Sequence, residues 1–292
     1  MHARVHRAGP AGPRVRQDAR VPALPPPVLR RFVALGDSTT EGVGDPWDPG
    51  REATSPLRGW ADRLAERLAA LHPGLTYANL AVRGLKAAQI RERQLDAAVA
   101  LAPDLVGMTG GLNDLLRPRL DLDAVLADLD AIQGTLTAAG ATVLTFTLPD
   151  LSAVAPVARP VRGRLAAYND GLRALHARHG SVLVDAAVQP VGEDPRLWAS
   201  DRLHPNAEGH ARLADAAAEA LRLPGASDAW TRGLHAAEPA PLPRALARET
   251  AWTVRFLAPW VGRRLRGASS GDGREAKRPV PGAPGEPPSA RP

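Results

Sequence analysis

Short runs of apolar residues alternate along the chain with longer segments in which apolar residues recur every three or four positions. Runs of the first kind are typical of buried strands, and segments of the second kind are typical of amphipathic helices. The runs predict strands at residues 31–36, 75–82, 104–111, 142–150 and 181–185. The segments between and after them predict helices at residues 59–73, 86–102, 121–140, 163–180 and 206–223.

Each predicted strand is followed by a helix, and this order favours parallel pairing through right-handed crossovers. The sequence therefore predicts an α/β fold, a three-layer α/β/α sandwich around a five-stranded parallel sheet. Ligands of such sheets bind outside the carboxyl ends of the strands. The loops expected at this edge read GDSTTEGVGD, RGL and TGGLND after the first three strands, and WASDRLHPN before the last helix.

The two ends of the chain differ from the middle in composition. Residues 1–30 are rich in Pro and Arg and predict a disordered basic tail, and residues 267–292 predict a disordered tail rich in Pro and Gly. Residues 31–224 hold all the predicted strands and helices and form the expected domain. Residues 225–266 are a C-terminal extension.

The net charge of +6 belongs to the ends of the chain. Residues 1–31 contribute +6 and residues 263–292 contribute +4, which leaves about −4 for residues 32–262. A basic, nucleic-acid-binding core is therefore not supported, and we expect no nucleic-acid partner.

The sequence contains no cysteine, which excludes disulfides, thiolate nucleophiles and zinc sites with cysteine ligands. The N-terminus lacks the apolar run of a secretory signal, and no stretch reaches the ~18 apolar residues of a membrane span. We therefore expect a cytoplasmic location.

A serine, a histidine and an aspartate in these loops have the residue types of a hydrolase site. A serine hydroxyl becomes a nucleophile when a histidine, oriented by a third group, takes its proton. Ser38 follows the first strand, and Asp201 lies three residues before His204 in a turn that ends at Pro205. The alternative is structural: Ser38 begins a capping box with Glu41, Asp201 caps a turn and His204 is solvated.

Acyl transfer also needs donors for the oxygen that becomes negative in the tetrahedral intermediate. Asn113 offers a side-chain amide, and Gly84 offers a backbone N–H that no side chain blocks. Taken alone, Asn113 is equally a helix N-cap and Gly84 an ordinary turn residue. Their occurrence with the serine and the histidine at one edge of the predicted sheet completes the set for acyl transfer.

The segments GDST, GLND and DRLHP, together with Gly84, resemble the conserved blocks of the SGNH hydrolases, also called GDSL esterases and lipases. The resemblance covers residues 32 to about 223, so it makes residues 31–224 an SGNH hydrolase domain. It implies a flavodoxin-like fold and a serine esterase that hydrolyses carboxylic (acyl) esters through an acyl-enzyme, without a metal or cofactor. Residues 36–39 read GDST, so Thr39 stands where the GDSL motif that names the family has leucine.

The same resemblance implies a role for each site residue. Ser38 is the expected nucleophile, His204 the general base and then the general acid, and Asp201 the residue that orients it. The backbone N–H of Ser38, that of Gly84 and the side chain of Asn113 form the expected oxyanion hole.

Two other functions stay open. An acyltransferase would use the same site with an alcohol in place of water. A non-catalytic, flavodoxin-like protein would bind an anion in the loops TGGLND and GDSTTEG, although the sequence has neither a GxGxxG fingerprint nor a P-loop. As substrate we expect a small-molecule or lipid acyl ester.

Several aromatic and histidine residues near these segments have no catalytic role in the expected mechanism. Trp47 and Trp198 are predicted either to line an acyl pocket or to anchor loops, whereas Trp60 is expected in the core. His210 matches no compact zinc pattern and is expected on the surface of the last helix.

The C-terminal extension holds a possible interaction surface. Residues 243–266 predict a basic amphipathic helix that contains Trp252, Phe256 and Trp260 and is interrupted by Pro259. Such a helix can make a peripheral membrane contact, bind a partner groove or dock on the body of the enzyme.

Overall fold

The computed structural model describes residues 28–51, 54–234, 249–266 and 269–287. The basic tail predicted at residues 1–30 therefore lies outside the described residues except for 28–30.

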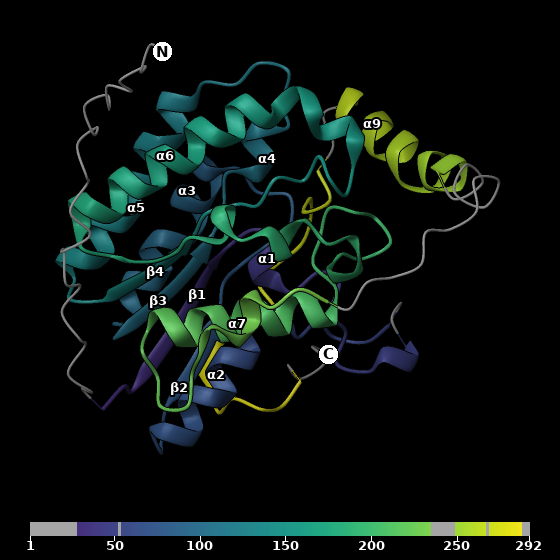
Figure 1. The fold of residues 1–292 in the computed structure, drawn as a ribbon. Helices are drawn as coiled ribbons and strands as arrows, with labels where there is room; N and C mark the ends of the chain where they lie inside the picture. Colours follow the sequence, from purple (N-terminus) through teal and green to yellow (C-terminus); the bar gives the residue numbers. More distant parts are fainter. Residues whose placement is uncertain (1–27, 52–53, 235–248, 267–268, 288–292) are drawn as a thin grey trace, which may run out of the picture.

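A central sheet with strand order β5-β4-β3-β1-β2-β6 organises the fold (Figure 1). Its strands are β1 (Arg31–Gly36), β2 (Thr76–Asn79), β3 (Leu105–Thr109), β4 (Thr142–Phe146), β5 (Val182–Val184) and β6 (Arg278–Gly282). The strands β1 to β5 pair in parallel, as the alternation of strands and helices predicts. The α/β/α prediction is confirmed, and the neighbouring strand ends place the loops after β1, β2 and β3 side by side.

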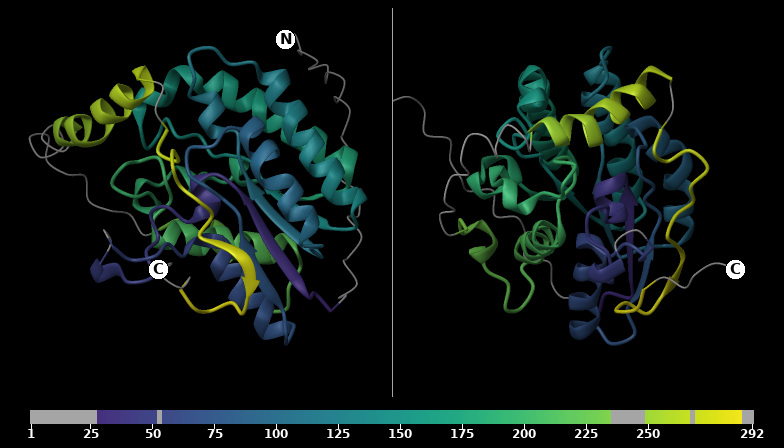
Figure 2. Two further views of the ribbon diagram at one scale, coloured as in Figure 1. Left: turned by 180° about the vertical axis from the view of Figure 1, so that it is seen from behind. Right: turned by 90° about the vertical axis from the view of Figure 1, so that its right-hand side faces the viewer.

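Helices cover both faces of the sheet (Figures 1 and 2). One face carries α3 (Ala87–Ala100), α5 (Leu122–Ala138) and α6 (Arg162–His179), and the other carries α2 (Gly59–Leu71) and α7 (Ala207–Ala220). Shorter helices and 3-10 turns are α1 (Ser38–Glu41), α4 (Leu112–Leu115), η1 (Pro49–Arg51), η2 (Pro156–Val161), η3 (Ala186–Val188), η4 (Pro190–Glu193), η5 (Pro195–Leu197) and η6 (Asp228–Thr231).

Each face of the sheet has its own apolar core. Ile90, Leu129 and Tyr168 are buried on the side of α3, α5 and α6. On the other side Trp60 is fully buried, as predicted, and its ring meets that of Phe146 edge to face at a centroid distance of 4.6 Å.

The sixth strand corrects the prediction of a five-stranded sheet. It lies within residues 267–292, for which the composition predicts disorder, and it pairs antiparallel with β2 at the edge of the sheet (Figure 2). The side chain of Lys277, just before β6, is 10% exposed, and its Nζ lies 2.6 Å from Oδ2 of the buried Asp62. This ammonium also donates to the carbonyl oxygens of Leu57 and Arg58, so the buried charge is fully paired.

The described part of the C-terminal extension is also helical. Residues 249–252 lead into a π-helical turn, η7 (Thr253–Leu257), and then into α9 (Ala258–Leu265). None of the helices in the described ranges has the length and apolar character needed to cross a membrane.

Candidate active site

The carboxyl end of β1 places Ser38 at the start of α1. The buried side chain of Gln94 accepts a hydrogen bond from the N–H of Gly36 at 2.7 Å and donates one to its carbonyl at 2.9 Å, which fixes the strand end. Asp37 is the N-cap of α1, because its carboxylate accepts from the N–H of Thr39. The capping alternative for Ser38 is therefore wrong, and its hydroxyl is directed elsewhere.

The hydroxyl of Ser38 meets the imidazole of His204 from the loop before α7. The Oγ atom of Ser38 lies 2.8 Å from Nε2 of His204, and Nδ1 of the same ring lies 2.6 Å from Oδ2 of Asp201. The structure thus brings together three side chains that are up to 166 positions apart in the sequence. In this chain of hydrogen bonds the imidazole can take the serine proton while the carboxylate holds its other nitrogen.

Asp201 has two structural tasks in its turn. Its Oδ1 accepts from the backbone N–H groups of Leu203 and His204, at 3.0 and 3.1 Å, while Oδ2 pairs with the imidazole. Burial raises the pKa of this carboxyl, but the hydrogen bonds and charge of His204 outweigh that effect and lower it below its ordinary value. The turn cap and the orienting contact, which the sequence presents as alternatives, therefore occur together.

The three groups that the sequence predicts as oxyanion donors are the N–H of Ser38, the N–H of Gly84 and the amide of Asn113, and these residues line one cavity. Among the described residues, neither the N–H of Ser38 nor that of Gly84 has a hydrogen-bond acceptor. The amide of Asn113 donates to the carbonyl of Leu85 at 3.1 Å and makes a longer contact of 3.4 Å with Asp37. Asn113 is not an N-cap, because Gly111 occupies that position of α4.

Position 84 requires a glycine, because the C-terminal segment passes close to its backbone. Its φ is +78°, and a Cβ there would lie 2.3 Å from Oγ of Ser269 and 2.9 Å from Oγ of Ser270. Ser269 also donates to the carbonyl of Gly84 at 3.3 Å. The backbone N–H at this turn stays accessible because the residue has no side chain.

These groups line a cavity of about 370 Å³. Ser38, Gly84, Asn113, Asp201 and His204 all contribute to it. The remaining wall includes Trp252, Phe256, Leu257 and Arg263 of the C-terminal extension, and Ser269 and Ser270 of the segment after it. None of these residues is predicted from the sequence to belong to the site. The apolar residues of the extension therefore face the candidate site, and a peripheral membrane contact of residues 243–266 stays a prediction.

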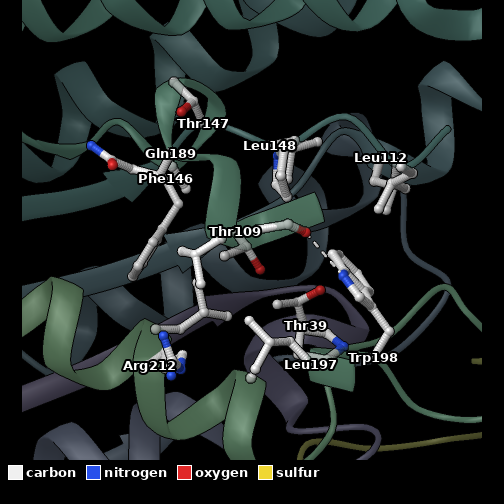
Figure 3. Close-up of a pocket in the computed structure, with 18 of the residues that line it drawn as sticks. Thr39, Thr109, Leu112, Phe146, Thr147, Leu148, Gln189, Leu197, Trp198 and Arg212 are labelled. Atoms are coloured by element: carbon white, nitrogen blue, oxygen red, sulfur yellow. Dashed lines mark hydrogen bonds between the residues drawn. The ribbon is translucent and has the colours of Figure 1, made fainter. Parts of the chain in front are cut away.

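A second cavity, of about 90 Å³, has an almost entirely apolar wall (Figure 3). Leu151 and Leu203 line both cavities, and Thr39, the neighbour of Ser38, lines the second. Trp198 lies in its wall, and its Nε1 donates to the carbonyl of Gly192 at 3.0 Å. Of the two predicted roles of Trp198, its position in this wall is compatible with lining an acyl pocket.

Trp47 does not share that position. Among the described residues that line the two cavities Trp47 is absent, and the guanidinium of Arg58 lies 4.8 Å from its ring centroid. The backbone N–H of Trp47 donates to the carbonyl of Pro56, so Trp47 holds the loop before α2. Of the two roles open to this residue, the structure favours the loop anchor.

His210 is fully buried, which corrects its predicted surface position. Its Nδ1 accepts from the N–H of Trp60 at 3.2 Å, and its Nε2 donates to the carbonyl of Val43 at 3.0 Å. Burial lowers the pKa of this imidazole to about 4, so the ring is neutral and joins α7 to α2. The sequence pattern places His210 on a helix, but its burial depends on contacts with Trp60 and Val43, which are distant in the sequence.

Asp37 gives the protein a pH-dependent stability. Burial raises the pKa of this carboxyl from 3.8 to about 6, against the opposing hydrogen bond from Thr39 and the charge of His204. Because the folded pKa is above the unfolded one, the group's contribution to stability is complete below pH 3.8 and is lost as the pH rises through 6.

The substitution Asp37→Asn keeps a capping side chain but removes the titrating carboxyl. We therefore expect the stability of the variant to fall less as the pH rises. Between pH 4 and pH 8 the variant should gain about 2 to 3 kcal/mol in unfolding free energy relative to the wild type. Urea unfolding at the two pH values measures the difference. Parallel pH profiles of the two proteins would contradict the assigned pKa.

Comparisons with known proteins identify the family and the fold. Residues 34–212 match the model of the GDSL-like Lipase/Acylhydrolase family. TesA is 25% identical with a TM-score of 0.53, over 66% of this chain and 98% of that chain. No curated protein sequence matches the chain.

Two further solved structures show the same fold. One is LAE5, an alpha/beta hydrolase enzyme from the metagenome of Lake Arreo, Spain, with 24% identity and a TM-score of 0.55 over 66% of this chain and 95% of that chain. The other is a catalytic mutant of Axe2, an acetylxylan esterase from Geobacillus stearothermophilus, with 21% identity and a TM-score of 0.56 over 70% of this chain and 97% of that chain. Since the family match covers more than half of the sequence, the chain belongs to the GDSL-like lipase/acylhydrolase family and is an esterase or acylhydrolase of the SGNH type.

Proposed function

We propose that the chain is a serine esterase that hydrolyses carboxylic esters through an acyl-enzyme on Ser38. The observation that carries the proposal is the 2.8 Å contact between Oγ of Ser38 and Nε2 of His204, at the wall of a cavity open to a substrate. A hydroxyl placed so close to an imidazole loses its proton to that base as it attacks a carbonyl carbon.

The reaction proceeds in two halves. Ser38 attacks the ester carbonyl while His204 accepts its proton on Nε2, and the tetrahedral intermediate then collapses as His204 returns that proton to the departing alcohol oxygen. A water molecule next gives a proton to His204 and attacks the acyl-enzyme, which releases the carboxylic acid and restores Ser38. Asp201 holds Nδ1 of the imidazole throughout, so that Nε2 stays free to accept a proton.

The negative oxygen of each intermediate is bound by three donors. The N–H groups of Ser38 and Gly84 have no acceptor among the described residues and line the cavity beside the hydroxyl. The Asn113 amide donates to Leu85 at 3.1 Å and contacts Asp37 at 3.4 Å, and it turns to the oxyanion by giving up the longer of these two contacts. Donors already in place in a site with little water stabilise the charge as it forms.

The apolar cavity is the place for the acyl group. It begins at Thr39, next to the nucleophile, and its wall includes Phe146, Leu197 and Trp198 (Figure 3). Its small volume of about 90 Å³ favours short acyl groups. Arg212 also lines it, but this guanidinium is already satisfied by Glu208 and by the carbonyl groups of Trp230 and Arg232.

Labelling with a fluorophosphonate tests the nucleophile. We expect one phosphonyl group to attach to Ser38, located by peptide mass spectrometry, together with release of acid from aryl acetate esters. Absence of both would favour the alternative of a flavodoxin-like protein that binds an anion without catalysis. Acyl transfer to an added alcohol in preference to water would instead favour the acyltransferase alternative.

The substitution Asn113→Ala tests the oxyanion hole. We expect kcat to fall about 10²- to 10³-fold, with a smaller change in KM, because the amide acts mainly on the charge of the transition state. Steady-state kinetics with an aryl acetate measures both constants, and thermal unfolding controls for the lost bond to Leu85. A variant with wild-type kcat would remove Asn113 from the oxyanion hole.

A further inference from the structure

The cavity beside Ser38 is lined by more basic than acidic side chains. Four arginines line it, Arg83, Arg117, Arg202 and Arg263, and Asp201 is the only carboxylate among its described lining residues. Asp201 is already engaged by His204 and by its own turn. A concave site lined by charge of one sign attracts ligands of the opposite sign.

Two of these arginines have acidic partners within the protein. Arg83 pairs with Glu41, with Nε 3.0 Å from both carboxylate oxygens. Arg202 forms two bonds of 2.7 Å with Glu249, which ties the loop of His204 to the C-terminal helical segment. These two guanidinium groups are neutralised and hold the cavity wall together.

The other two arginines make no direct ion pair in the described part of the chain, although the charge of Arg117 acts on the nearby Asp114 carboxyl. No ion pair is formed there by Arg117 or by Arg263. The Nε atom of Arg117 is buried and has no hydrogen-bond partner among the described residues, which is an unfavourable state for a charged donor. An anion supplied by a ligand would satisfy it.

The side chain of Arg164 fixes the backbone at Arg117. Arg164, from α6, donates to the carbonyl oxygen of Arg117 at 2.7 Å and to that of Pro118 at 3.2 Å. Arg263 lies about 150 positions later in the sequence, on α9. Trp252, in the helical segment before α9, fixes that segment to the site, because its Nε1 donates to the carbonyl of Asp201. The family match ends at residue 212, so Arg263 lies outside it.

We propose that the alcohol part of the substrate carries an anionic group, a carboxylate or a phosphate, which Arg117 and Arg263 bind beside Ser38. The inference rests on the proposed esterase function and adds the substrate class. The acyl part is directed to the apolar cavity past Thr39, where no guanidinium is free, so the charge belongs to the leaving group. The product alcohol leaves with the charge, and the chemistry at the carbonyl is unchanged.

Two pairs of butyrate esters that differ in charge test this proposal. The first pair is O-butyryl-lactate and O-butyryl-lactamide, and the second is 1-butyrylglycerol 3-phosphate and 1-butyrylglycerol. Release of butyrate gives kcat/KM for all four esters with one assay. We expect the full-length protein to favour the anionic member of at least one pair by about 10- to 100-fold, as for a hydrogen bond to a charged group.

The pair that shows the preference identifies the anion as a carboxylate or as a phosphate. Arg117→Gln and Arg263→Gln should each lower the ratio of the two kcat/KM values about tenfold, and 0.5 M NaCl should lower it further through screening. Arg119→Gln is the matched control, because it removes the same charge from an exposed residue two positions away, outside the cavity. Arg263 is exposed on its helix, so its variant reports on the site even if the Arg117 variant fails to fold.

Equal rates for the charged and neutral esters of both pairs would overturn the proposal and leave the esterase function intact. A preference for the anionic ester that persists in both arginine variants would also overturn the proposal, because other residues would then bind the charge. Failure of the wild type to hydrolyse any of the four esters would count against the esterase function and against the inference that rests on it.

Discussion

The substitution Ser38→Ala is expected to lower kcat/KM for butyrate and acetate esters by at least about 10⁴-fold. Without the hydroxyl, His204 has no nucleophile within reach and the acyl-enzyme cannot form. The alanine removes one oxygen that lies at the cavity surface, and the cap of α1 is made by Asp37, so we expect the fold to persist. Release of acid, followed by titration, measures the loss, and thermal unfolding measures the stability.

A second serine gives a matched control for this experiment. The hydroxyl of Ser181 is buried and has no hydrogen-bond partner in the part of the chain that the structure describes, and Ser181 lines neither of the two cavities. The substitution Ser181→Ala should therefore leave turnover unchanged. Loss of turnover in both variants would point to a general effect of the substitutions, and full turnover by the Ser38 variant would exclude this serine as the nucleophile.

The sequence is sufficient to predict the parallel part of the fold. The apolar runs that become β1 to β5 are short and flanked by helical segments, and the pattern is local, so it is visible without a partner. The same order brings the ends of β1, β2 and β3 to one edge, where the loops with Ser38, Gly84 and Asn113 meet. The catalytic roles of these residues stay predictions, although their placement agrees with the expected one.

The C-terminal segment could not be predicted in this way. Its strand β6 is short, contains two prolines and pairs with Tyr77 and Asn79, about 200 positions earlier. Composition alone favours disorder for such a segment, because few of its residues are apolar. What holds it is the buried pair of Lys277 and Asp62, and a pair so distant in the sequence leaves no periodic signal.

Charge in the site is equally a property of the folded protein. The raised pKa of Asp37 is caused by burial, which depends on how the loops pack around the end of β1. The unpaired state of Arg117 depends in the same way on which acids lie near it in space. The sequence supplies the count of charges, whereas the fold decides which of them remain available to a ligand.

The substitution Asp201→Asn should lower kcat about 10³- to 10⁴-fold while it preserves the loop. In the wild type Oδ1 of Asp201 accepts from the N–H groups of Leu203 and His204, and an asparagine oxygen can keep both bonds. The amide NH₂ then takes the place of Oδ2 and faces Nδ1 of His204. That nitrogen becomes an acceptor, so the ring proton moves to Nε2, where it blocks removal of the proton from Ser38.

Kinetics of this variant are best compared with those of Asp170→Asn. Asp170 also pairs with a residue three positions later, Arg173, but on the exposed surface of α6, so its variant removes a similar ion pair and should retain full activity. Wild-type thermal unfolding of the Asp201 variant with a large loss in kcat would support the orienting role. A loss of less than about tenfold would show that His204 keeps its tautomer without the carboxylate, and the hydrogen bond to Asp201 would then serve the turn alone.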